Sequence, residues 1–376
     1  MVLQVQIKKK LGEFQLDVSF EMEQEVFAIL GASGCGKSMT LKCIAGIETP
    51  DEGRIVLNNR VLYDSQKKIN LPPQKRKVGY MFQDYALFPS MTVEKNIMAG
   101  MGKKPDIKLV QRYIQQFCLT GLEKHYPAQL SGGQKQRVAM ARMIASEPDL
   151  LLLDEPFSAL DTYLKWEMEQ EMRDVLAKVG KPVLFVSHNR DEVYRMCHKV
   201  SCINNGRMEV VEPVKEFFHN PKTRAAAILS GCKNISTAEV IDETHVKAVG
   251  WNIILTIPYQ SEAGRIKSVG IRAHNFHKDR EEAKKNISSE NRLQGNVVQK
   301  NIEQENIAQE SMIEENVFQI KEYRILEDPF EWNISFRVDE QSGWIQWKIA
   351  KREGEPLEIP KELYLKSTDV LLLEER

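Results

Sequence analysis

A glycine-rich segment with one lysine and one serine gives the most direct indication of chemistry. Residues 31–38 are GASGCGKS, which matches the phosphate-binding loop G-x-x-x-x-G-K-[ST]. In such a loop the glycines let backbone N–H groups converge on a phosphate, the lysine reaches the β- and γ-phosphates, and the hydroxyl holds Mg²⁺. The predicted nucleotide-binding residues are therefore Gly31, Ala32, Ser33, Gly34, Cys35, Gly36, Lys37, Ser38 and Met39.

Two acidic residues follow an unbroken run of four leucines, residues 150–153. A run without polar residues is typical of a parallel strand that is buried on both faces. Such a strand delivers Asp154 and Glu155 to the carboxyl edge of a sheet, where ligands of open α/β folds bind. Asp154 suits a Mg²⁺ shell together with Ser38, and Glu155 can orient or deprotonate an attacking water.

The elements that must position these residues are also visible in the sequence. The apolar run 25–30 predicts a strand leading into the glycine-rich loop, and the run 182–187 predicts another strand leading to His188. Between them, Val110, Tyr113, Ile114 and Phe117 have the spacing of one helix face. We therefore expect an α/β fold with a helical subdomain at about 84–135.

A second specific motif, LSGGQ at 130–134, completes the pattern. With it, residues 1–230 resemble the nucleotide-binding subunits of ABC transporters, which are P-loop NTPases. In that family the motif opens a helix and is presented to ATP bound by the opposite subunit. The resemblance implies a homodimer that binds ATP and Mg²⁺ in two shared sites, with a contribution in trans from Ser131, Gly132, Gly133 and Gln134.

The resemblance assigns three further residues. Gln83 matches the Q-loop glutamine, a magnesium-sensing and catalytic position, Asp161 matches the D-loop at the dimer interface, and His188 matches the switch histidine that contacts the γ-phosphate. The family usually stacks adenine on an aromatic residue before the P-loop, and here the alignment offers Phe14 or Leu11. Phe14 is equally compatible with a core position, because it alternates with apolar residues at 16, 18 and 20.

Composition limits the partners. The 376 residues carry a formal net charge of −1, which gives no bias toward nucleic acid. No stretch approaches the ~18 apolar residues of a membrane span, and the N-terminus lacks the apolar core of a signal peptide. Six cysteines without a regular framework fit a reducing cytosol. We expect a peripheral protein on the cytoplasmic face of the membrane, working with two separate integral membrane permease subunits and, indirectly, a substrate-binding protein.

The composition changes after Ser230, which predicts a second domain at 231–376 with a low-complexity insertion at about 278–315. Around the insertion, apolar runs predict a small antiparallel β-barrel, OB-like, or a sandwich. The predicted strands are Thr244–Val249, Trp251–Ile257, Tyr323–Leu326, Trp332–Val338, Trp344–Ile349 and Val370–Leu373. The segment GIRAH at 270–274 resembles GIRPE in the accessory domain of importer ATPases, with Ala-His in place of Pro-Glu.

The cargo is indicated by weaker features. Residues 231–235 and 270–274 resemble the C-terminal region of bacterial ATPases for sulfate and molybdate import. Residues 288–295 only faintly resemble a molybdate-binding module, and Glu290 there should repel an oxyanion. Two roles are compatible with the second domain: a sensor that binds the transported anion, and a clasp that holds two chains together as a dimer. The sequence predicts the ATPase of an oxyanion importer, with another importer (sugar, polyamine or metal) or a soluble ABC ATPase as the alternatives.

Overall fold

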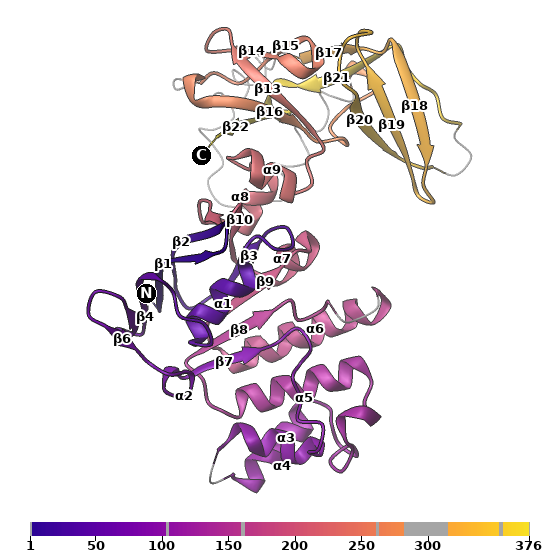
Figure 1. The fold of residues 1–376 in the computed structure, drawn as a ribbon. Helices are drawn as coiled ribbons and strands as arrows, with labels where there is room; N and C mark the ends of the chain where they lie inside the picture. The colour runs from indigo at the N-terminus through magenta and orange to yellow at the C-terminus, as the bar shows by residue number, and fades with distance from the viewer. Residues whose placement is uncertain are drawn as a thin grey trace, which may run out of the picture. The chain divides into compact units, whose positions relative to one another are not determined.

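The structure, a computed structural model, describes residues 2–102, 105–158, 162–260, 263–281, 315–352 and 356–375. The chain divides into two compact units, Met1–Phe217 and Phe218–Arg376 (Figure 1). This division falls before the predicted boundary at Ser230, because Ala227 of helix α9 (Arg224–Leu229) packs against Leu371 and Leu373 of the last strand. Most of the predicted insertion, including Glu290, lies outside the described residues.

One mixed sheet forms the centre of the first unit, in the order β6-β5-β4-β1-β2-β11-β10-β3-β9-β8-β7, with β12 paired to β10. Its parallel part contains β10 (Lys199–Asn204), β3 (Val26–Leu30), β9 (Val183–Ser187), β8 (Leu150–Asp154) and β7 (Val78–Met81). Its antiparallel part contains β1 (Leu3–Leu11), β2 (Phe14–Met22), β4 (Glu52–Leu57), β5 (Arg60–Asp64) and β6 (Ile69–Asn70). Strands β11 (Arg207–Met208) and β12 (Glu212–Pro213) are short.

The register of the parallel strands determines where their loops emerge. Leu30, the last residue of β3, pairs with Ser187, the last residue of β9. On the other side of β9, Val186 pairs with Asp154, the last residue of β8. Because parallel strands end at the same edge of the sheet, the segments that follow these three strands leave from neighbouring positions.

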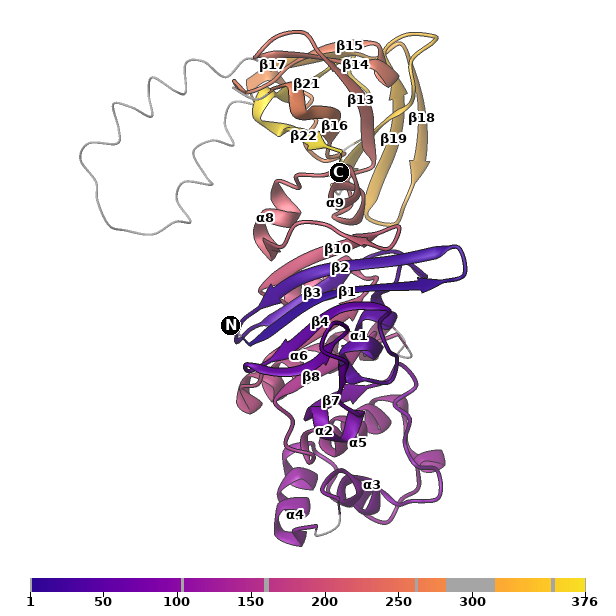
Figure 2. The same cartoon turned by 60° about the vertical axis from the view of Figure 1, so that its left-hand side comes forward.

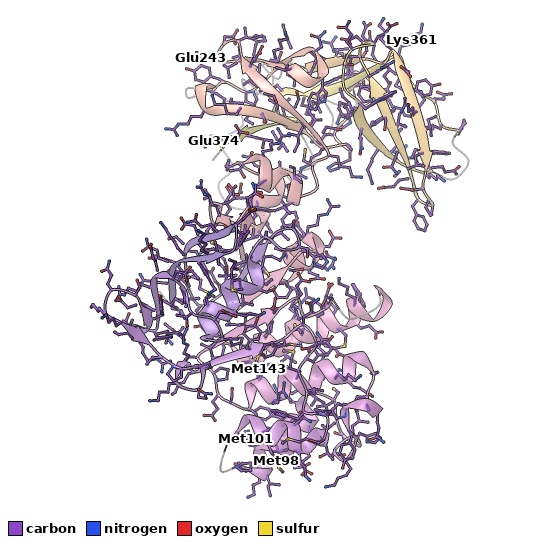
Figure 3. The ribbon with its side chains drawn as sticks, viewed as in Figure 1. Met98, Met101, Met143, Glu243, Lys361 and Glu374 are labelled. Atoms are coloured by element: carbon purple, nitrogen blue, oxygen red, sulfur yellow. The ribbon has the colours of Figure 1, made fainter. Side chains whose placement is uncertain are left out.

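Helices accompany the sheet and fill the long segment between β7 and β8. The first unit also contains α1 (Lys37–Ala45), α2 (Pro73–Arg76), α6 (Thr162–Val179) and α7 (Arg190–Met196), and the division between the units falls within α8 (Val214–His219). Between β7 and β8 lie α3 (Val93–Gly100), α4 (Ile107–Gln116), η1 (Pro127–Gln129) and α5 (Gly132–Ile144). Figure 3 labels Met143 of α5, which packs on Gly79 of β7. No helix in the described ranges is long and apolar enough to cross a bilayer.

The second unit is built almost entirely from strands (Figure 2). A five-stranded antiparallel sheet has the order β15-β14-β13-β16-β22, a three-stranded sheet has the order β18-β19-β20, and β17 pairs with β21. The bounds are β13 (Asn234–Val240), β14 (His245–Ala248), β15 (Ile253–Thr256), β16 (Ile266–Ile271), β17 (Glu315–Gln319), β18 (Glu322–Glu327), β19 (Glu331–Arg337), β20 (Ile345–Ala350), β21 (Glu362–Lys366) and β22 (Val370–Glu374), with 3-10 turns η2 (Val249–Trp251), η3 (Ala263–Arg265) and η4 (Ser367–Asp369).

All three sheets contribute to one core, which includes the mutually edge-on rings of Phe276, Phe318 and Phe336. This strand-rich unit fits the predicted OB-like accessory domain. The six predicted strands are present, but the second begins at Ile253, because Trp251 lies in η2 and Asn252 adopts a φ of 53°. The sequence did not reveal β13, β16, β17 and β21, which complete the sheets.

One buried arginine connects α1 to the rest of the first unit. Arg76 is 0% exposed. Its guanidinium donates to four acceptors at 2.7–2.8 Å, namely the carbonyl oxygens of Cys43, Ile44 and Leu71 and the amide oxygen of Asn70. Two of these carbonyls lie in the last turn of α1: the Cys43 oxygen also accepts from the N–H of Gly46 at 3.3 Å, whereas Ile44 lies too near the helix end to have an N–H of the helix available.

We expect Arg76→Met to destabilise the first unit by about 3 kcal/mol, because the buried carbonyls would lose their donors. Urea unfolding followed by circular dichroism measures this loss. The neighbouring exposed residue provides the control: Lys75→Met should change the free energy of unfolding by less than about 0.5 kcal/mol. A loss below about 1 kcal/mol for Arg76→Met would contradict the assigned role.

Candidate active site

The glycine-rich loop lies between β3 and α1. Gly34 and Gly36 adopt φ values of 79° and 108°, which strongly favour glycine. Gly36 is the N-cap of α1, and a Cβ there would lie 2.5 Å from Leu16 Cδ1. The loop therefore needs glycine at position 36 for both conformation and space, and it leaves the first N–H groups of α1 directed out of the helix, as an anion site requires.

Lys37 is buried at the start of α1. Its Nζ donates to the carbonyl oxygens of Gly31 at 2.9 Å and Ala32 at 2.8 Å, and it lies 3.7 Å from Glu155 Oε1. The remaining loop residues differ in exposure: Ala32, Ser33 and Gly34 are exposed, Ser38 and Met39 are half-buried, and Cys35 is buried. Burial raises the pKa of the Cys35 thiol, which favours its neutral form.

The structure brings Ser38 and Asp154 together. Ser38 Oγ donates to Asp154 Oδ1 at 2.7 Å, although 116 residues separate them in the sequence. The two side chains present hard oxygen donors, and Mg²⁺ is usually bound by one or two such protein ligands plus water and phosphate oxygens. The donor set therefore fits magnesium.

Glu155 and His188 form the next pair along this edge. His188 Nδ1 lies 3.0 Å from Glu155 Oε2. Glu155 adopts a φ of 45°, and its N–H donates to the carbonyl oxygen of Val186 at 3.0 Å. A positive φ at a residue with a side chain costs about 1–3 kcal/mol and is concentrated at functional positions. The turn directs the carboxylate of Glu155 toward both Lys37 and His188.

Gln83 is exposed two residues after the end of β7, and the chain then turns sharply. Tyr85 and Ala86 adopt φ values of 62° and 42°. Arg142 of α5 donates to their carbonyl oxygens at 2.9 and 2.8 Å, and its guanidinium lies 5.1 Å from the ring centroid of Phe88. Tyr85 is buried, whereas Phe88 is 46% exposed.

The LSGGQ segment forms the start of α5. Ser131 is exposed and caps the helix: its Oγ accepts from the N–H of Gln134, and its own N–H donates to Oε1 of the Gln134 side chain. Gly133 is buried and faces Met168. A Cβ on Gly133 would lie 3.0 Å from the sulfur of Met168, so the position leaves little room for a side chain. Further along α5, Gln136 donates to the carbonyl oxygen of Pro156, the residue after Glu155, at 3.3 Å.

Two predicted positions have a different status. Asp161 lies outside the described residues. Phe14 is half-buried and continues the core-facing row of β2, with its ring 3.3 Å from the position of a Cβ on Gly36. It therefore borders the glycine-rich loop while packing against the core, and adenine stacking by Phe14 stays a prediction.

Sequence reasoning missed three residues that join the site together: Tyr80, which donates to Asp154 Oδ2 at 2.8 Å, Gln136 and Arg142. Arg142 carried a signal, because it is a charged residue inside the apolar run VAMARMI of residues 138–144. Tyr80 and Gln136 carried none, since each lies in a segment where its type is unremarkable.

The geometry agrees with comparisons to known proteins. The family described as ABC transporter matches residues 15–158. The molybdenum import ATP-binding protein ModC of Aliivibrio fischeri is 40% identical over 226 residues, which cover 59% of this chain and 61% of ModC. The Fe(3+) ions import ATP-binding protein FbpC of Haemophilus influenzae is 39% identical over 243 residues, which cover 63% of this chain and 69% of FbpC. The chain belongs to the ATP-binding proteins of ABC transporters.

A solved structure supports the same fold for this ABC protein. It is cbiO1 from Clostridium perfringens, described as part of the ABC transporter complex cbiONQ, with a TM-score of 0.51 and 28% identity. The similarity covers 58% of this chain and 90% of that one. The chain spans about three fifths of the length of ModC.

Arg142→Lys should destabilise the first unit by about 2 kcal/mol, because an ammonium lacks the planar fork that serves two carbonyl oxygens. Urea unfolding measures the loss. Arg137→Lys on the same helix is the control: Arg137 pairs with the partly exposed Glu171, so its substitution should cost under about 1 kcal/mol. Equal losses for the two variants would contradict a special role for Arg142.

Proposed function

We propose that this ABC protein binds and hydrolyses ATP and so energises import through separate membrane subunits. The observation that carries the proposal is the convergence of Lys37, Ser38, Asp154, Glu155 and His188 at one edge of the parallel sheet. The resemblance of the LSGGQ, Q-loop and switch-histidine segments to the family supports the same function.

Each residue has a part that follows from its position. The N–H groups at the start of α1 and Lys37 hold the phosphates, for which Lys37 gives up its bonds to the loop carbonyls. Ser38, Asp154 and Gln83 hold magnesium, which when bound neutralises phosphate charge. Glu155 orients and deprotonates water, and His188 both positions Glu155 and contacts the terminal phosphate. Phe14 and Met39 border the nucleotide.

The site requires a second copy of the chain. Ser131 and the first N–H groups of α5 form an anion-binding helix end, because the N–H groups of Gly132 and Gly133 have no acceptor within their own helix. We propose that this helix end and Asp161 serve the nucleotide held by a partner chain, in a homodimer with two shared sites.

We further propose that the complex contains two integral membrane permease subunits and receives cargo from a substrate-binding protein, with this chain peripheral on the cytoplasmic face. Molybdate or sulfate is the proposed cargo, and the resemblance to ModC, named for molybdenum import, supports molybdate. FbpC, named for Fe(3+), supports a metal importer as the second candidate.

Co-purification with a protein of several membrane spans tests the transporter assignment, and a chain that never associates with one would favour a soluble ABC ATPase.

Glu155→Gln should lower kcat for ATP hydrolysis at least about 100-fold, because the amide cannot accept a proton from water. Nucleotide binding should persist, and gel filtration with ATP should show a dimer. Glu216→Gln, the same change at an exposed position of α8, should leave kcat unaltered. A monomeric Glu155→Gln chain with normal turnover would refute the role of Glu155.

Mixing two inactive variants tests the shared sites. Ser131→Arg and Lys37→Ala chains should each be nearly inactive alone. In a heterodimer, one site combines a sound P-loop with a sound LSGGQ segment, so an equal mixture should regain roughly a quarter of the normal rate if subunits associate at random. Heterodimers proven by differential tags but without any recovered activity would exclude shared sites.

A further inference from the structure

The Asp154 carboxylate receives a hydrogen bond on each oxygen. Ser38 Oγ donates to Oδ1 at 2.7 Å, and the hydroxyl of Tyr80 donates to Oδ2 at 2.8 Å. Asp154 is only 6% exposed. Among the described residues these are the two side chains bonded to this carboxylate, since Lys37 donates instead to the P-loop carbonyls and faces Glu155.

The sheet determines why Tyr80 reaches Asp154. Strands β7 and β8 are parallel neighbours, and Tyr80 pairs with Leu152. Side chains alternate along a strand, so Leu152 and Asp154 point to the same face, and Tyr80 shares that face. Asp154 lies two residues, roughly 6.6 Å, further along the strand, a distance that the long tyrosine side chain spans. The ring of Phe82 packs beside that of Tyr80, with the two ring centroids 4.4 Å apart, and supports the orientation of the tyrosine ring.

We propose that Tyr80 is a positioning residue for the metal end of the ATP site: its hydroxyl fixes Asp154 Oδ2, so that Oδ1 stays beside Ser38 in the orientation that receives magnesium. The inference rests on the proposed function, because it concerns the same site. It assigns to Tyr80 a task that the motifs around it do not specify.

The hydroxyl of Tyr80 is the donor in this contact, because an ionised carboxylate only accepts hydrogen bonds. Phenylalanine would fill nearly the same volume but leave Oδ2 without a donor. The carboxylate would then be free to rotate away from Ser38, and partners that orient metal ligands contribute about 10- to 100-fold to metal affinity.

The experiment measures metal binding rather than turnover. Mn²⁺, which accepts the same oxygen ligands as Mg²⁺, is titrated into the full chain with ADP, and bound metal is followed by electron paramagnetic resonance. Fluorescent ADP is titrated separately in EDTA. For Tyr80→Phe we expect about tenfold weaker Mn²⁺ binding, with metal-free ADP affinity changed less than twofold because the P-loop is intact.

Tyr63→Phe is the matched control. Tyr63 is also buried, and its hydroxyl donates to the carbonyl oxygen of Pro50 at 2.6 Å, away from the proposed metal ligands. Both titrations should match those of the unmodified chain. Tyr80→Met, a flexible apolar replacement that also removes the hydroxyl, should reproduce the Mn²⁺ loss and replaces Tyr80→Phe if that variant does not fold.

The outcomes separate this inference from the proposed function. Unaltered Mn²⁺ affinity in a folded Tyr80 variant would overturn the role of Tyr80 and leave ATP binding by the unmodified chain intact. Equal losses of metal-free ADP affinity and Mn²⁺ affinity would also overturn it, because they would indicate a general structural role. An unmodified chain that binds neither ADP nor metal with ADP would refute the proposed function itself.

Discussion

The parallel register of β3, β9 and β8 is the constraint on which the rest of the site depends. It makes Leu30, Ser187 and Asp154 end at one edge of the sheet, so that three segments far apart in sequence leave from adjacent positions. Hydrogen bonds then join them: Ser38 to Asp154, and His188 to Glu155. A shift of one residue in any of these pairs would turn the following side chains to the opposite face.

Helix α5 extends this constraint to the helical segment. Its Arg142 holds the turn after Gln83, its Gln136 contacts the residue after Glu155, and its first turn presents Ser131. One helix therefore contacts both the turn after Gln83 and the residue after Glu155, and it begins at the segment proposed to act in trans. A displacement of α5 would therefore move the turn after Gln83, the residue after Glu155 and Ser131 together, since a packed helix moves as a unit.

The second unit contributes a separate core rather than an extension of this site. Its three phenylalanine rings pack edge to face, and its tryptophans are used within the domain: Trp347 is 2% exposed, and Arg324 lies 4.2 Å from the ring centroid of Trp344. These aromatic side chains therefore serve the unit's own packing, and the choice between an anion sensor and a dimer clasp stays a prediction.

The sequence by itself determined the family, the phosphate-binding loop and the acidic strand end, because these depend on residue type and short spacing. It also determined six of the accessory strands through apolar runs, but not β13, β16, β17 or β21, in which polar residues interrupt or flank short apolar stretches. Only the tertiary structure decided that Tyr80 meets Asp154, that Tyr85 is buried and that Ala227 belongs to the second unit. Those outcomes depend on which strands are neighbours and in what register, and such long-range pairing leaves no mark in local sequence.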